Sequence, residues 1–150
     1  MKKLLLMMLV GAIAFGQQNA NSQKRAPSQA KELTRAEFED MLTKPDQVLL
    51  IDLRRPDEVT KVGGFPAYFS IQIADLDKNL AWIPRDRTII TVSNHATRSG
   101  QAADILAKNG FKVAGTVGAQ TYEEQGGKLT KIVPPPPAAN RTTTAVTEKK

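Results

Sequence analysis

The chain of 150 residues contains no cysteine. It therefore has no thiol for a disulfide, no thiolate that could carry a persulfide, and no cysteine ligand for zinc. The same absence excludes lipid attachment to a cysteine behind the N-terminal apolar run. Histidine is nearly absent too, because His95 is the only one. One histidine without cysteine offers no ligand cluster for a metal ion, so we expect neither a metal nor a cofactor.

Long hydrophobic runs are also missing, since none reaches the ~20 residues that cross a bilayer as a helix. The longest lies in MKKLLLMMLVGAIAFG, where two lysines precede an apolar run that ends in small residues. This order is typical of a secretory signal. We predict a signal peptide at residues 1–20, cut after Gly16 or after Ala20. The protein is then exported, periplasmic or secreted, with no stable membrane span after signal removal. An uncleaved membrane anchor is the alternative.

Acidic residues are too few to balance the basic ones over the whole chain, whose net charge is +6 with a pI near 9.7. Between Lys31 and Lys131, however, each lysine or arginine is matched by an aspartate or glutamate. The excess positive charge therefore lies in the two ends. Basic ends on a neutral domain favour export and solubility over nucleic-acid binding, so we expect no nucleic-acid partner. Weak attraction to an anionic surface remains open.

Composition divides the chain into a central domain and two polar ends. Residues 21–32 are polar and lack periodicity, which predicts a flexible lead-in. Residues 133–150 contain four consecutive prolines and a threonine-rich basic end, which predict a disordered tail. We place the folded domain at residues 33–132.

Helical and strand patterns alternate within this domain. Thr34 with Glu37 forms a capping box that predicts a helix start, and Asn109-Gly110 ends a helix that begins at Arg98. A short helix is expected at residues 74–83, with Leu76, Leu80, Trp82 and Ile83 as its inner face. Strands are expected at residues 48–53, 69–73, 88–93 and 111–117. The first strand is apolar nearly throughout, as in parallel sheets covered on both faces.

The alternation predicts an α/β fold. We expect a three-layer domain with a mostly parallel central sheet of about four to five strands, flanked by helices. Ligands of such sheets bind at the carboxyl ends of the strands, and the loop SNHATR lies at one of these ends.

Three blocks of the sequence resemble the rhodanese-homology domain. IDLRRPDEV resembles the D-x-R-x-P-x-E segment of that family, at Asp52, Arg54, Pro56 and Glu58. GGFP, residues 63–66, resembles the G-H-I-P turn, and TVSNHATRSGQAADILAKNGF, residues 91–111, resembles the active-site strand, loop and helix. A weaker fourth block, residues 117–127, has Tyr122 where tryptophan is usual. The likeness covers about residues 33–132.

The resemblance implies an anion-binding loop that has lost its nucleophile. In the enzymes of this family, the loop C-x-x-x-x-R or K cradles a sulfur or phosphate oxyanion, and its cysteine carries sulfane sulfur as a persulfide. Ser93 falls at the cysteine and Arg98 at the basic end; Asn94, His95, Ala96 and Thr97 lie between them. A serine hydroxyl cannot hold a stable persulfide. We therefore expect no thiosulfate sulfurtransferase activity and no cysteine-dependent phosphatase activity.

Two functions from different classes follow. The first is a catalytically inactive, exported rhodanese-like domain that acts as a binding or interaction module. Its loop, residues 93–98, would hold a small oxyanion or an acidic group of a partner protein through backbone amides and Arg98. The alternative is a hydrolase or transferase that uses Ser93 with His95 and Arg98. Side chains close together on one tight loop, however, are rarely oriented towards each other as a nucleophile and its base must be.

Blander interpretations stay open. The loop can be a plain connection between strand and helix, with His95 in solvent, and the fold can be a spacer whose tail attaches to the cell envelope. Two further residues of the first block support the site without catalysing. We expect Asp52 to accept hydrogen bonds from neighbouring loop amides, and Arg54 to form an ion pair with Glu58.

Overall fold

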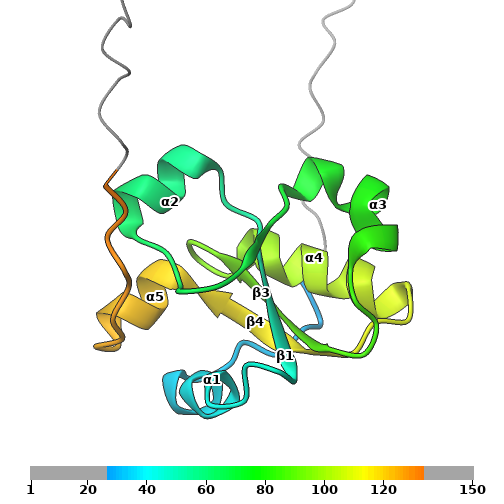
Figure 1. Cartoon of the computed structure of the whole chain (residues 1–150), viewed down its shortest axis with the longest axis horizontal. Helices are drawn as coiled ribbons and strands as arrows, with labels where there is room; N and C mark the ends of the chain where they lie inside the picture. The colour runs from blue at the N-terminus through cyan, green and yellow to red at the C-terminus, as the bar shows by residue number, and fades with distance from the viewer. Residues whose placement is uncertain (1–26, 134–150) are drawn as a thin grey trace, which may run out of the picture.

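A four-stranded parallel sheet organises the part of the chain that the computed structural model describes, residues 27–133 (Figure 1). The predicted signal peptide, the first part of the predicted lead-in and all but the first residue of the predicted tail lie outside the described residues. The strands are β1 (Val48–Asp52), β2 (Phe69–Ser70), β3 (Thr88–Ser93) and β4 (Val113–Gly118), in the order β2-β1-β3-β4. All neighbours are parallel, which confirms the predicted α/β class.

Within residues 27–133, five helices and two 3-10 turns precede, connect or follow the strands. They are α1 (Arg35–Leu42), α2 (Pro56–Val62), α3 (Leu76–Asn79), α4 (Thr97–Lys108), α5 (Ala119–Glu124), η1 (Ile73–Asp75) and η2 (Leu80–Trp82). The predicted capping box at Thr34 is formed: its hydroxyl accepts the Glu37 amide, and the Glu37 carboxylate accepts the Thr34 amide. The predicted helix from Arg98 begins one residue earlier, at Thr97.

The helices cover both faces of the sheet, so the three-layer prediction is confirmed (Figure 1). Side chains alternate across a strand, and accordingly Leu50 of β1 faces one core while Ile51 faces the other. The first core joins the sheet to α1 and α5 through an aromatic cluster of Phe38, Phe65 and Tyr122. The second core joins the sheet to α3 and α4. The carboxyl-terminal parts of the central strands are therefore buried on both faces.

The region between β2 and β3 differs from the sequence prediction. The expected strand 69–73 is only two residues long, and Ile73 already belongs to the turn η1. On the expected inner face of the following helix, Leu76 and Ile83 are buried and Leu80 is partly buried against the same core, but Trp82 is 79% exposed. The helix breaks into α3 and the tighter turn η2, and the change of pitch turns Trp82 outward.

The segment before α1 lies against the open edge of β4. Thr116 donates its amide to the Lys31 carbonyl and accepts the Leu33 amide, both at 2.9 Å. Residues 31–33 therefore shield the β4 edge. Among residues 27–133, no helix is long and apolar enough to cross a membrane.

Candidate functional site

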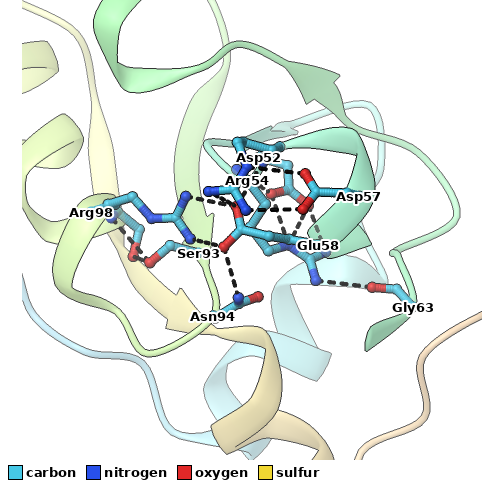
Figure 2. A network of polar contacts seen from close by, with 10 residues as sticks. Asp52, Arg54, Asp57, Glu58, Gly63, Ser93, Asn94 and Arg98 are labelled. Atoms are coloured by element: carbon cyan, nitrogen blue, oxygen red, sulfur yellow. Dashed lines mark hydrogen bonds and ion pairs between the residues drawn. The ribbon is translucent and has the colours of Figure 1, made fainter. Parts of the chain in front are cut away.

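The carboxyl ends of β1 and β3 bring the predicted site residues together. Asp52 pairs with Val92 in the sheet, so the loop that follows Ser93 lies beside the loop that follows Asp52. Helix α2 begins after the loop that follows Asp52, and helix α4 begins after the loop that follows Ser93. Figure 2 shows the resulting network, in which Arg98 and Glu58 face each other from these two helices.

Ser93 points into the protein. Its side chain is buried, with 1% of the residue exposed. Its Oγ accepts the amide of Ser99 at 3.2 Å and shares a hydrogen bond with the Ser99 hydroxyl at 3.0 Å. The hydroxyl of Thr116, on β4, donates to the same Ser99 hydroxyl. The serine at the expected nucleophile position thus satisfies one of the otherwise unpaired amides at the start of α4.

The loop itself turns sharply at Ala96. This residue has a φ of 59°, in the left-handed region that favours glycine. It is also the N-cap of α4, and no side chain caps the helix from that position. As the first residues of the helix, Thr97 and Arg98 have amides with no partner within it. These amides give the loop a partial positive charge that suits an anion.

His95 lies on the surface and does not face Ser93. It is exposed, and its carbonyl accepts a hydrogen bond from the Thr97 hydroxyl at 3.4 Å. No hydrogen bond links Ser93 and His95 anywhere in the described range 27–133. The same range holds no group of three histidine, cysteine, aspartate or glutamate residues that could bind a metal ion.

Arg98 is held by Glu58 in a two-pronged ion pair. Its two terminal nitrogens donate to the two carboxylate oxygens of Glu58 at 2.8 and 2.5 Å. Asn94 donates its amide to Glu58 at 3.1 Å, and the backbone amide of Arg55 donates at 2.9 Å. The side-chain oxygen of Asn94, Oδ1, is buried and has no hydrogen-bond partner among the described residues. Glu58 therefore ties α2 to both ends of the 93–98 loop (Figure 2).

These contacts set the ionisation of the pair. The guanidinium of Arg98 and the Arg55 amide lower the pKa of Glu58 from 4.5 to about 2, against the opposing effect of its burial. The Glu58 carboxylate in turn raises the pKa of Arg98. Glu58 carries a negative charge at neutral pH and neutralises much of the charge that Arg98 would offer to an anion.

Asp52 and Arg54 form a second, fully buried pair. Their side chains are 1% and 0% exposed, and Arg54 donates to Asp52 through its Nε and one terminal nitrogen, the latter at 2.7 Å. Its other terminal nitrogen donates to the carbonyl of Gly63, just after α2. The expected pair of Arg54 with Glu58 is therefore wrong. Arg54 pairs with Asp52 at the end of its own strand, while Glu58 pairs with Arg98 of α4. Asp52 does accept a loop amide, that of Arg54, as predicted.

The structure thus joins some predicted site residues and separates others. Asn94 and Arg98 meet on Glu58, Ser93 turns inward, and His95 turns to solvent. Sequence reasoning missed Glu58 as the partner of Arg98. Its place in D-x-R-x-P-x-E was the available signal, but four-residue spacing from Arg54 suggested the nearer partner.

Comparisons with known proteins agree with this geometry. The family model of the rhodanese-like domain matches residues 34–118. The structure is similar to a rhodanese-related protein from Thermoplasma volcanium, with a TM-score of 0.60 and 21% identity over 68% of this chain and 99% of that chain. No curated protein matches the chain.

Two further solved structures share the fold. One is a protein of unknown function from Rhodopseudomonas palustris, described as a possible tyrosine phosphatase (TM-score 0.57, 23% identity, 67% of this chain and 84% of that chain). The other is a rhodanese-like domain protein from Staphylococcus aureus (TM-score 0.54, 22% identity, 61% and 89%). At these identities the likeness establishes the fold and no activity.

Proposed function

The chain belongs to the rhodanese-like domain family, and from this premise we propose that it is an exported, catalytically inactive member that works as a binding module. The observation that carries the proposal is the state of position 93. Its hydroxyl is buried and occupied by Ser99, and no base contacts it in the described part of the chain. A serine without a base is a poor nucleophile and cannot carry sulfur. The loop that remains has binding groups and no reacting group.

The ligand that fits the loop is a small oxyanion or an acidic group of a partner protein. The amides of Thr97 and Arg98 begin the twelve-residue helix α4, whose N-terminus favours negative charge. Arg98 is 31% exposed, so its guanidinium is reachable from solvent. An anion competes with Glu58 for this guanidinium, and we expect weak binding in consequence.

Export is supported by the sequence of residues 1–20 and by the basic ends on a neutral domain. No observation favours the alternative of an enzyme built on Ser93, His95 and Arg98, because the first of these residues faces the interior and the second faces solvent.

Thermal unfolding of the expected mature chain, residues 21–150, tests the proposal. Sulfate, phosphate and thiosulfate are titrated at constant ionic strength. A ligand that binds only the native state stabilises it by ~2.7 kcal/mol at a hundred times its Kd. We expect a saturable rise in Tm for at least one anion, and we expect thiosulfate and cyanide together to give no thiocyanate above background.

Three variants locate the effect. Without ligand, Arg98→Ala lowers Tm, because Glu58 loses its partner. The quantity compared is therefore the rise in Tm that the anion causes. In Arg98→Ala this rise should vanish. In Arg87→Ala, at the opposite end of the sheet, the anion should still raise Tm. Glu58→Gln should increase the anion-induced rise in Tm, because the Arg98 guanidinium is then free of the carboxylate. If no anion raises Tm in any of these proteins, including Glu58→Gln, the loop is only a connection.

A further inference from the structure

A mostly apolar groove lies beside the amino-terminal part of β1, at the end of the sheet opposite to the 93–98 loop. It encloses about 550 Å³, and its walls include Pro45, Leu49, Tyr68 and Phe69. Phe69 is 42% exposed, so an aromatic ring is available to a molecule that enters the groove. The groove is separate from the candidate site, and its occupant does not depend on the function proposed for that site.

The groove opens onto the edge of β1. Val48, Leu49 and Leu50 all line it. Successive side chains of a strand point to opposite faces, and accordingly Leu49 packs against one core while Leu50 belongs to the other. Three consecutive residues border one hollow only where the hollow runs along the edge of their strand. The backbone of β1 is therefore part of the groove wall.

The backbone groups at this edge have no strand opposite them. The Asp52 carbonyl accepts the Ile71 amide on the side of β2. Because backbone groups alternate between the two sides of a strand, those of Val48 and Leu50 face the same side. β2 pairs with β1 only at Ile51 and Asp52, so the Leu50 amide and both backbone groups of Val48 have no partner there within the described residues. Such an edge is a template for a further strand.

Arg87 adds a positive charge at one end of this edge. Among the described residues that line the groove, it is the only charged one. It precedes Thr88, which pairs with Val48 at the start of β1. One of its terminal nitrogens donates to the Pro45 carbonyl at 3.0 Å. Unlike Arg98, it forms no ion pair with a carboxylate of the described residues, so its charge is available to an acidic ligand.

We propose that the groove binds an extended, apolar segment of a partner protein, which adds as a strand to the outer edge of β1 and places an acidic side chain against Arg87. Backbone groups of the segment pair with Val48 and Leu50, and its apolar side chains fill the hollow as far as Phe69. In this mode of recognition, main-chain hydrogen bonds supply affinity and pockets for alternate side chains supply specificity. A lipid chain or another purely apolar ligand would leave both the β1 backbone and the guanidinium without partners.

Hydrogen exchange with a synthetic peptide tests the proposal. The probe is the acetylated and amidated peptide Glu-Val-Ile-Val-Glu, whose two acidic ends serve either strand direction. Exchange is followed by NMR in the expected mature chain, residues 21–150. An amide that pairs with the peptide exchanges only when the peptide leaves, so the Val48 and Leu50 amides should exchange about tenfold more slowly at about ten times the Kd. The Leu49 and Ile51 amides, which face β3, should change little.

Charge exchange locates the acidic end of the peptide. The same peptide with lysine in place of glutamate should slow these amides far less in the parent protein. Arg87→Glu should reverse the preference between the two peptides. Arg85→Glu changes the charge equally, but Arg85 lies over the Phe111 ring and does not line the groove. This control should keep the preference of the parent.

Four results would overturn the proposal. Exchange of Val48 and Leu50 that stays unchanged at every peptide concentration would show that no strand is added. Equal slowing by a peptide that is N-methylated at its central amides would exclude backbone pairing. Equal slowing by the lysine peptide would exclude the contact with Arg87. Slowing that grows with protein concentration in the absence of peptide would mean that a second copy of the chain covers the edge.

Discussion

Serine at position 93 stabilises the start of α4 and has no solvent-facing side. Its hydroxyl accepts the Ser99 amide and meets the Ser99 hydroxyl, which also accepts from Thr116. A hydroxyl suits this network, because it both donates and accepts in short hydrogen bonds, whereas a thiol does each weakly. Serine at position 93 is thus well matched to the interior of this domain.

Glu58 predicts a pH dependence of stability. Its pKa is lowered to about 2 in the folded protein, from an ordinary value of 4.5. The folded state therefore binds the proton less tightly than the unfolded state, so the stabilisation is complete above pH 4.5 and is lost as the pH falls towards 2. Glu58→Gln removes this contribution. Its free energy of unfolding should be lower than that of the parent at neutral pH, and the difference should shrink between pH 4.5 and 2.

Urea unfolding across this pH range measures the effect. Glu124→Gln, an exposed glutamate at the end of α5, serves as the control and should follow the parent at every pH. A constant difference between Glu58→Gln and the parent over the whole range would show that the Glu58 charge is not the cause.

At the scale of an element, the turn from β3 to α4 stores strain. Ala96 has a φ of 59°, where its Cβ crowds the following carbonyl at a cost of roughly 1–2 kcal/mol. The turn persists because both of its ends are fixed, by Ser93 on β3 and by the ion pair of Arg98 with Glu58.

Ala96→Gly should stabilise the protein by about 1 kcal/mol. Glycine adopts this backbone conformation without the steric cost, and the gain exceeds the entropy that glycine adds to the unfolded chain. Ala107→Gly, at an exposed position in the last turn of the same helix, should destabilise the protein, by less than the ~1 kcal/mol expected in a helix interior. Urea unfolding of both variants gives the two signs, and a loss of stability in Ala96→Gly would contradict the strain.

At the scale of the whole molecule, the segment before α1 packs over the candidate loop and its helix. The Gln29 amide donates to Asp104 of α4, and Ser28 lies over Gly100. A Cβ on Gly100 would come within 2.7 Å of the Ser28 Cβ. Between this segment and the loop, a hollow of about 320 Å³ is bordered by His95 and Thr97. The approach to the loop from this side is therefore shaped by residues 27–32.

Gly100→Ala should lower the stability of the parent protein but raise the stability of a protein that also carries Ser28→Gly. In the parent, the new methyl group displaces Ser28, and hydrogen exchange of residues 29–31 should accelerate. In a Ser28→Gly background the clash is absent, and the better helix propensity of alanine should stabilise the protein by about 1 kcal/mol. Equal effects in both backgrounds would mean that the segment does not rest on Gly100.

The sequence by itself determined the class of the fold and the residues of its loop. Its strongest signals were local: buried strands at residues 48–53 and 88–93, the capping box at Thr34, and Ser93 and Arg98 at the ends of the loop. These features depend on side-chain periodicity and neighbouring backbone, which a sequence displays directly. The sequence also shows, through its lack of cysteine, that no residue of this chain can carry a persulfide.

Only the tertiary structure decided which charges meet and which way side chains point. Glu58 is four residues from Arg54 but bonds Arg98, because parallel pairing of β1 and β3 sets their two loops side by side. Ser93 is buried in a hydroxyl network that reaches Thr116 of β4 through Ser99, and exposure of Trp82 follows from a change of helical pitch. The hollow lined by Pro45, Leu49 and Tyr68 lies where β2 stops after two residues. Each of these is a relation between segments far apart in the chain, and only the folded geometry determines it.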